Sequence, residues 1–434
     1  MKNKHCLVIG AGLAGLAAAH RLLENKWSVE VLEADTNRLG GRVFTKRVIS
    51  GGKPDLVYEL GGEWIGTSHK RVIQLCDDFR LKRMPHRFAF AFVEEGKASK
   101  FYKPGKLPFS SRENAAFKRF QKSARKMSSC QEKELDRMDW WTKVAELGFS
   151  TKSLLRRDLM DSTDFGESIR HTSAFVGATE YTVGNRYDEM DEKIVGGNDR
   201  LIYALADSIK KGRGRIYTGC DVSHISQGSG GVNVITRNGK KYGADACICA
   251  VPASRLHRIR WTPALSPEQL SAARQLQFAR IVKTAFLFPK KFWADKTVEG
   301  FSLFTNRASD FCFESTFGQK GDEGIICSYA IGDKADDLAD EHGDELAKWL
   351  SEDLSDSLGT ERVYGKFLHR KAWQRDKCIG GAYALYRPGQ WFHVRPALQR
   401  PHQRVSFAGE HLSEEWQGFM EGAIETGEAA ADAL

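Results

Sequence analysis

The chain has 434 residues, which at about 150 residues per domain predicts two or three domains. With 41% hydrophobic and 28% charged residues it has an ordinary globular composition, and no apolar run approaches the roughly 20 residues of a membrane helix. The formal charge of +9 is spread along the chain without interleaved aromatics, so we expect neither a nucleic acid nor a membrane as partner. Nine scattered cysteines predict free thiols and no metal site. Because no cleavage site follows the basic start, we expect a cytoplasmic protein.

The first 33 residues follow the order strand, glycine turn, helix, strand and acid. The apolar run at residues 6–9 ends at Gly10, which allows a tight turn, and Gly12 lets the backbone approach a pyrophosphate. Gly15 lets the helix pack closely on the strand, and the helix N-terminus offers free N–H groups to phosphates. Glu33 stands where such a unit places the carboxylate that binds a ribose. The stretch therefore predicts a dinucleotide site.

Two further glycine pairs follow. Residues 38–43 place Gly40 and Gly41 between arginines, which favours a loop over the nucleotide with a guanidinium near a phosphate. Residues 58–66 hold a second pair between β-like residues, and a simple hairpin turn is the alternative there.

The rest of the chain alternates predicted helices and strands. We expect an aromatic strand near 86–102, mostly helix over 111–173, and a helix that begins near 194–201 and ends at Lys211. Hairpins are expected over 214–250, with a turn at Asn238-Gly239. The later predictions are a strand at 283–288, one acidic amphipathic helix over 336–358, a strand at 405–410 and a last helix that begins at 418–423.

In this order the motifs resemble those of the flavin-dependent monoamine oxidases and L-amino acid oxidases. The resemblance also rests on residues 196–198 and 250–252, on Lys283, and on the pair Trp373 and Tyr383. It implies an α/β fold in which a discontinuous Rossmann-like FAD-binding domain joins an α+β substrate-binding domain with a mixed sheet and a helical part. The first domain would comprise residues 1–79, 194–280 and 378–434, and the second 80–193, mostly helical, and 281–377.

The resemblance also implies which residues bind FAD. Arg42 would lie near the pyrophosphate, the backbone of Val222 would meet the adenine, and Glu410 would face the phosphate and ribityl region. The Met420 N–H, at a helix start, suits a flavin that is anionic when reduced. The full predicted set is Gly10, Gly12, Ala14, Gly15, Glu33, Ala34, Gly40, Gly41, Arg42, Gly61, Gly62, Glu63, Trp64, Val222, Trp373, Gly409, Glu410, Gly418, Phe419 and Met420.

The implied catalytic residues are Lys283, Tyr383, Phe419, Trp416 and Trp373. Tyr383 and Phe419 would sandwich the amine against the flavin, with Trp416 as a third wall, although core packing is the alternative for each aromatic residue. Lys283 would hold a water against the flavin, and an edge-strand lysine in solvent is the alternative.

Three departures from the family pattern bear on the site. The loop after Glu33 is one residue longer and carries Asp35, which leaves the phosphate contacts of residues 35–37 open. Ala382 stands where covalent members carry the flavin-linked cysteine, so we expect non-covalent FAD. Phe419 replaces a tyrosine.

The favoured function is oxidative deamination of an L-amino acid, with O2 as electron acceptor. No arginine precedes Arg71 in the stretch where many amino acid oxidases bind the carboxylate; Arg87 is a candidate, and a solvated strand end is its alternative. An amine oxidase acting on substrates without a carboxylate is the second reading, while a flavin desaturase or a non-catalytic FAD-binding partner is more distant. The sequence leaves a homodimer open.

Overall fold

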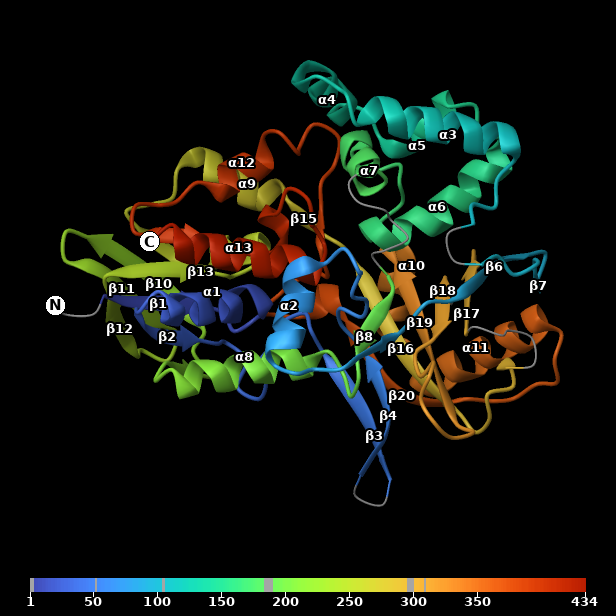
Figure 1. Cartoon of the computed structure of the whole chain (residues 1–434), viewed down its shortest axis with the longest axis horizontal. Coiled ribbons are helices and arrows are strands. Elements are labelled where there is room, and N and C mark those ends of the chain that lie inside the picture. The colour runs from blue at the N-terminus through green and yellow to red at the C-terminus, as the bar shows by residue number, and fades with distance from the viewer. Residues whose placement is uncertain (1–3, 51–52, 104–105, 183–189, 295–299, 308–309) are drawn as a thin grey trace.

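The computed structural model describes residues 4–50, 53–103, 106–182, 190–294, 300–307 and 310–434. One end of the molecule is a five-stranded parallel sheet in the order β22-β13-β1-β2-β9 (Figure 1). Its strands are β1 (His5–Ile9), β2 (Ser28–Leu32), β9 (Arg215–Tyr217), β13 (Ala246–Cys249) and β22 (Val405–Phe407). They come from distant stretches of sequence, so the sheet forms only when these stretches meet.

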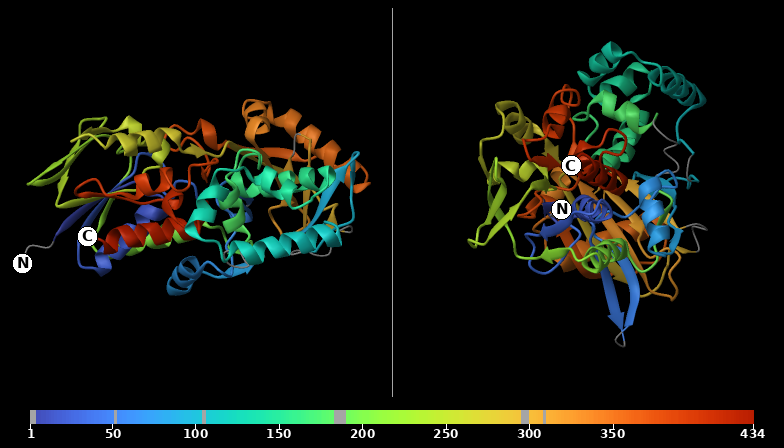
Figure 2. Two further views of the ribbon diagram at one scale, coloured as in Figure 1. Left: turned by 90° about the horizontal axis from the view of Figure 1, so that it is seen from above. Right: turned by 60° about the vertical axis from the view of Figure 1, so that its left-hand side comes forward.

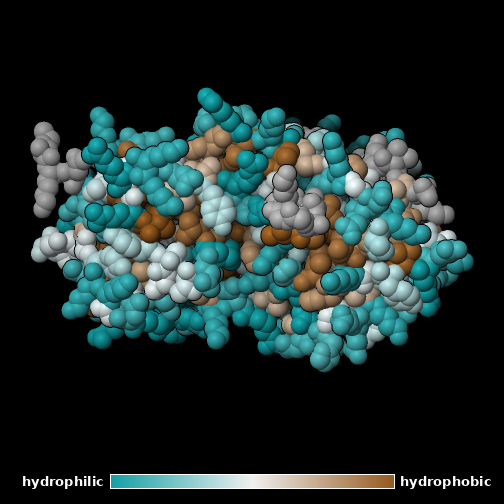
Figure 3. Space-filling view, turned by 90° about the horizontal axis from the view of Figure 1, so that it is seen from below, coloured by the Kyte–Doolittle hydropathy of each residue, from teal (hydrophilic) through white to brown (hydrophobic). Residues whose placement is uncertain are grey.

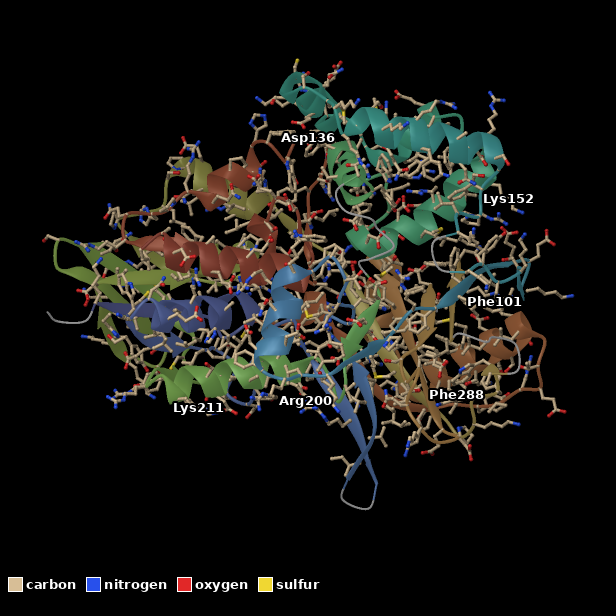
Figure 4. All side chains as sticks on the ribbon, in the orientation of Figure 1. Phe101, Asp136, Lys152, Arg200, Lys211 and Phe288 are labelled. Carbon is tan, nitrogen blue, oxygen red and sulfur yellow. The ribbon has the colours of Figure 1, made fainter. Side chains whose placement is uncertain are left out.

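Three helices cover this sheet and fix its geometry. They are α1 (Leu13–Glu24), α8 (Asp199–Lys211) and α13 (Met420–Asp432). Helix α1 packs on both of the others, and a Cβ on Gly427 would lie 2.2 Å from the Ala14 carbonyl oxygen, so glycine is required for this approach of α13 to α1. Figure 4 places the exposed Arg200 and Lys211 at opposite ends of α8, and the predicted end of this helix at Lys211 is confirmed.

A seven-stranded mixed sheet forms the other half, in the order β20-β16-β19-β18-β17-β6-β7. Its strands are β6 (Ala89–Glu94), β7 (Lys97–Ala98), β16 (Ile281–Phe288), β17 (Phe301–Thr305), β18 (Phe311–Glu314), β19 (Gly324–Ile331) and β20 (Lys366–Ala372). The β6–β17 pair is parallel and the other pairs are antiparallel. Strand β16 pairs on both sides, with β19 and β20, which makes it an interior strand.

A group of helices lies beside the seven-stranded sheet and away from the parallel sheet (Figures 1 and 2). They are α3 (Ser111–Ala124), α4 (Ser129–Asp136), α5 (Trp140–Glu146), α6 (Thr151–Phe165) and α7 (Ala174–Glu180). Capping explains several starts: Ser110 and Glu113 form a capping box on α3, and Ser128 and Gln131 form one on α4. The expected helical stretch at 111–173 is confirmed, as several short helices.

Several further elements are short. Three pairs of strands are the hairpin β3 (Thr45–Ser50) and β4 (Lys53–Glu59), β5 (Arg83–Pro85) with β8 (Glu192–Ile194), and β15 (Gln277–Phe278) with β21 (Ala384–Leu385). A small sheet consists of β10 (Val222–Gly228), β11 (Gly231–Thr236), β12 (Lys241–Ala244) and β14 (Arg260–Thr262), and the short helices are α2 (Lys70–Asp78), α9 (Pro267–Gln275) and α12 (Val394–Gln399). The predicted hairpin turn at Asn238-Gly239 connects β11 to β12, with Gly239 at φ +82°.

The single helix expected over 336–358 is wrong. The structure has α10 (Gly332–Leu338) and α11 (Gly343–Leu358), and His342 between them is extended, with ψ 132°. Gly343 starts α11 against the ring of Phe367, which lies 2.6 Å from where a Cβ would stand. Asp344 and Glu345 then occupy the first turn of α11, where carboxylates complement the helix dipole. The acidic pattern therefore marked a helix start and not one continuous solvated face.

The expected α/β class is confirmed, with one parallel and one mixed sheet. The proposed domain boundaries stay a prediction. Within the described parts of the chain, no helix combines the length and the apolar character that a membrane crossing requires.

Candidate functional site

One long cavity of about 790 Å³ extends from the carboxyl ends of the parallel strands to the seven-stranded sheet. Its lining begins at Ile9 and Leu32, the last residues of β1 and β2, and reaches Lys283 on β16 and Tyr329 on β19. Figure 3 shows apolar side chains gathered along the middle of one face, between hydrophilic edges. The carboxyl ends of parallel strands are where ligands bind in open α/β sheets, and the volume is that of a ligand site.

The structure brings nearly all the predicted site residues to this cavity. Its walls include Gly10, Gly12, Ala14, Glu33, Ala34, Gly40, Gly41, Arg42, Gly61, Gly62, Glu63, Trp64, Val222, Lys283, Trp373, Tyr383, Gly409, Glu410, Gly418, Phe419 and Met420. Two predicted residues, both in described parts of the chain, are not in its lining. Gly15 lies behind the glycine turn, and the ring of Trp416 packs edge-on against Phe419 and His69.

The first glycine turn has the geometry of an anion-binding site. Gly10 has φ +99° and donates its N–H to the Leu32 carbonyl at 2.8 Å, which ties the turn to β2. Helix α1 begins at Leu13, so its N-terminal N–H groups lie at the cavity wall. Glu33 accepts the N–H groups of Ala11 at 2.6 Å and Asp35 at 2.9 Å; burial raises the pKa of this carboxyl, and these hydrogen bonds partly offset the rise.

The loop after β2 is held by its own side chains. Asp35 accepts the N–H groups of Asn37 at 2.8 Å and Arg38 at 3.3 Å, so its carboxylate turns back into the loop. Arg38 donates to the Gly41 carbonyl at 2.6 Å. Arg42 donates to the Ala382 carbonyl at 2.6 Å and pairs with Glu410, so this guanidinium joins the loop of Gly40 and Gly41 to the last segment of the chain.

The opposite end of the chain adds a second helix start. Glu410 accepts the Gly418 N–H at 2.9 Å, and Gly418 has φ +90°. This holds the turn from which α13 begins at Met420, with Phe419 and Met420 both in the cavity wall. The N-terminus of α13 therefore places partial positive charge at the cavity.

Lys283 lies at the centre of a buried polar cluster beside these turns. The side chain is 2% exposed, and its ammonium donates to a Glu63 carboxylate oxygen at 2.7 Å and to the Gly61 carbonyl at 3.1 Å. Burial would lower the pKa of Lys283, but the charge and hydrogen bond of Glu63, together with the nearby Cys327 and Glu59, outweigh burial and the pKa is raised. The alternative of an edge-strand lysine in solvent does not hold, since β16 is an interior strand and the lysine is buried and paired.

Aromatic side chains form the walls near Lys283. The Tyr383 hydroxyl donates to the Thr163 carbonyl at 2.5 Å and lies 2.9 Å from the Tyr329 hydroxyl. Trp373 donates its indole N–H to the Leu60 carbonyl at 2.8 Å. The lining continues with a set of apolar residues outward from this point, namely Trp64, Phe88, Phe90, Met160, Phe304 and Phe311.

Several lining residues were missed by the sequence reasoning. His86 reaches the cavity from a loop, Thr163 and Asp164 from α6, and Tyr329 from β19, and no motif surrounds any of them. Tyr329 sits in the buried run of β19, so its hydroxyl was the one available signal. Arg87 also lines the cavity; its side chain is 43% exposed and pairs with Asp191.

The comparisons with known proteins cover nearly the whole chain. The profile of the family described as flavin containing amine oxidoreductase matches residues 13–434. The chain is 27% identical to an L-amino acid dehydrogenase of Synechocystis sp., over 99% of this chain and 94% of that protein, and 25% identical to the flavin-containing amine oxidase A of Sus scrofa, over 98% and 84%. The fold is similar to that of a putrescine oxidase solved with putrescine, with a TM-score of 0.84 at 19% identity and coverage of 99% and 98%.

Proposed function

The chain belongs to the family of flavin-containing amine oxidoreductases, and from that premise we propose that it is an FAD-dependent L-amino acid oxidase. The amine-bearing carbon would lose a hydride and the amine nitrogen a proton, so that the C–N bond becomes the C=N bond of an imine, which water hydrolyses to a keto acid and ammonia. Molecular oxygen would take the two electrons and two protons and become hydrogen peroxide.

The residues present fit a dinucleotide flavin. A Cβ added at Gly41 would lie 3.3 Å from the Gly12 Cα, so the two glycines face each other without side chains and leave backbone open to a diphosphate. Glu33 lies at one end of the cavity, where it suits a ribose, and the start of α13 lies in the same wall as Lys283. The donor groups at both helix starts suit the negative charge of the diphosphate and of a reduced flavin.

A bound flavin would supply the hydride acceptor, and the protein's own residues would do the rest. Lys283 holds a fixed ammonium at the cavity wall, where it can hydrogen-bond a water. Tyr383 and Phe419 would confine the amine, because both rings line the cavity beside the Gly418 turn. The apolar walls around them exclude bulk water from the reacting carbon.

Arg87 is the observation that supports a carboxylate on the substrate. Arg87 lies in the lining of the cavity, as does its sequence neighbour Phe88. Guanidinium groups bind carboxylates through paired hydrogen bonds. The Arg87–Asp191 pair orients the side chain, and the aromatic walls favour an amino acid with a large apolar side chain.

The tyrosine pair favours the second candidate, an amine without a carboxylate. Tyr383 gives its proton to the Thr163 carbonyl, so the contact between the two hydroxyls requires Tyr329 to donate to Tyr383. Both protons are then used inside the protein, and the pair offers lone pairs to the cavity. Lone pairs accept hydrogen bonds from an amine and repel a carboxylate.

The test compares each amino acid with its decarboxylated amine, for example phenylalanine with phenethylamine, by peroxide formation and by dye reduction. If Arg87 binds the substrate carboxylate, an amine that lacks this carboxylate should lose about 2–5 kcal/mol of transition-state stabilisation, or roughly 30-fold or more in kcat/KM. Arg87→Met should shrink this difference, while Lys106→Met, a second cation in the lining, serves as the matched control. Equal or faster turnover of the amine would establish an amine oxidase instead.

A further inference from the structure

The carboxylate of Glu63 accepts hydrogen bonds from three other side chains of the protein. One oxygen accepts the Lys283 ammonium at 2.7 Å, and the other accepts His86 Nε2 at 2.9 Å and the Ser315 hydroxyl at 3.2 Å. Burial would raise the pKa of Glu63, but Lys283 and His86 outweigh it and lower the pKa to about 2. Glu63 is therefore an anion throughout the working range of pH.

The loop that carries Glu63 is held tightly in place. A Cβ on Gly61 would lie 2.1 Å from the Arg42 carbonyl oxygen, so only glycine allows this approach. Gly62 donates to the same carbonyl at 3.0 Å, and the Asn198 amide donates to the carbonyls of Gly62 and Glu63 at 3.0 and 2.8 Å. The position of the carboxylate is thus fixed before any ligand enters.

His86 supports this carboxylate from the other side. Because an ionised carboxylate only accepts hydrogen bonds, Nε2 must carry the ring proton. Nδ1 is buried and, among the described residues, has no hydrogen-bond partner, as expected for a neutral ring. Burial together with the charge of Lys193 lowers the pKa of His86 to about 4. His86 therefore orients Glu63 without cancelling its charge.

We propose that Glu63 is the positioning residue for Lys283, and that its carboxylate keeps the lysine both charged and aimed at the cavity where the flavin would lie. Two of the three ammonium N–H groups go to Glu63 and Gly61, which leaves one for the cavity among the contacts of the described residues. The Glu63–Lys283 pair is electrically neutral as a unit. It gives the cavity a directed donor without a charge that varies with pH.

The other titratable groups around the pair allow a clean test. Cys327 and Tyr329 face Lys283 from β19, and burial raises both of their pKa values, to about 12 for Cys327. Lys193 on β8 donates to the Ser315 carbonyl at 2.5 Å and has a pKa lowered by burial. Glu59 has a pKa raised to about 7 by burial, and Glu314, with a pKa raised by burial, faces Lys193 from β18. Among the described residues around the pair, Glu59 is therefore the group with a pKa near neutral, while the pKa values of Lys193 and Glu314 are shifted toward neutral pH, so these three groups are the ones whose own breaks the variants must separate.

The experiment measures the midpoint potential of the bound flavin against pH, between pH 6 and 10, without any amine. In Glu63→Gln the buried lysine loses its anion, and such lysines lose several pKa units. Below the new pKa the unpaired ammonium should raise the potential above that of the wild type. As the pH rises through that pKa the lysine becomes neutral and the two potentials should converge. The wild type should lack this break.

Matched variants show whether Lys283 causes the break in the plot of midpoint potential against pH. The double variant Glu63→Gln with Lys283→Met should lack the break, and so should Glu63→Asp, which keeps a carboxylate. Glu59→Gln should remove only a break that the wild type already has. A Glu63→Gln curve that follows the wild type at every pH, or a break that survives in the double variant, would overturn the proposal.

If the Glu63→Gln protein does not fold or does not retain flavin, a second measurement on Lys283→Met tests the same pairing. Lys283→Met leaves Glu63 without its cation, so a break from protonation of the carboxylate should appear toward the lower end of the range. Since removing one partner of a buried pair costs more than removing both, the double variant should unfold at a higher urea concentration than Lys283→Met. A Lys283→Met protein with the wild-type curve and a double variant of lower stability would contradict the pairing. The inference rests on the proposed function only for the presence of flavin, and a chain that binds none would disprove that function and not this pairing.

Discussion

Ala382 determines how a flavin would be held. Its N–H donates to the Ala279 carbonyl at 2.8 Å and its own carbonyl accepts Arg42, so the backbone is fixed and a methyl group lines the cavity. Two thiols, Cys220 and Cys378, also line the cavity. Cys378 precedes Ala382 by four residues and is an exposed residue; partial desolvation of its thiol and the charge of Asp376 raise its pKa, which keeps the thiol protonated.

We therefore expect the flavin to be bound without a covalent link. Precipitation of the holoenzyme with acid should release the yellow chromophore into the supernatant. Cys378→Ser should behave identically, because no thioether is expected at that position. Flavin that stays in the washed pellet of the wild type would show that one of the lining thiols is linked to it.

The sequence revealed the unusual residue of the cluster but not its partners. A lysine within an apolar strand is conspicuous, because it needs an anion or must lose its proton. The anion, Glu63, is 220 residues earlier in the chain, and His86 reaches it from another loop. Nothing in local spacing links three such residues, so the pairing appears only when the fold brings the two loops to β16.

Among the elements, the turn between β1 and α1 is the most tightly specified. Gly15 does not line the cavity, but a Cβ there would lie 1.9 Å from the Gly10 carbonyl oxygen. Gly15 therefore allows the close packing of α1 behind the turn, while Gly10 and Gly12 line the cavity in front of it. The sequence predicted this packing role directly, since the spacing of the three glycines fixes which face each one occupies.

Gly15→Ala should push α1 away from β1 and disturb the N–H groups at the start of the helix. Overpacking of this kind typically costs about 1–3 kcal/mol, and we expect weaker FAD retention as well. Gly228→Ala is the control, because a Cβ there meets no atom within 4 Å. Urea unfolding and FAD titration measure the two effects, and equal behaviour of both variants would disprove the steric argument.

Helix boundaries were harder to predict than helix existence. The acids after Asp336 fit one amphipathic helix, yet the chain extends at His342 and restarts at Gly343 against Phe367. The ring comes from β20, and its position depends on the whole mixed sheet. Tertiary contacts of this kind override local periodicity.

On the scale of the whole molecule, the cavity connects the parallel sheet to the mixed sheet. Residues from both sheets line it, so a ligand that fills its length contacts both halves. A ligand that binds only the folded state stabilises it by RT ln(1 + [L]/Kd), about 2.7 kcal/mol at 100 times Kd.

FAD added to flavin-free protein should therefore raise Tm in a concentration-dependent way. Riboflavin at the same concentration should raise it much less, because it leaves the Gly10 and Glu33 end without a ligand. Differential scanning fluorimetry on the same apoprotein sample compares the two. Equal shifts would indicate that the dinucleotide end contributes no binding energy.

The sequence predicted the fold class because its motifs mark strand ends in a fixed order. It could not show how the walls near the substrate are assembled, since Tyr329 and Thr163 come from a strand and a helix with no shared motif, and Arg87 was only a candidate. Their proximity follows from strand register and from the helices beside the sheet, which are properties of the folded chain.

The order of synthesis gives the contact between α1 and α13 a further meaning. The glycine turn at Gly10 is synthesised long before β22, Glu410 and the start of α13, which follow it by about 400 residues. Until then β13 has no β22 beside it, and Arg42 has no Glu410. The half of the site that β1 and α1 form therefore stays open until β22 and the start of α13 have been made, and only then can the cavity close around a ligand.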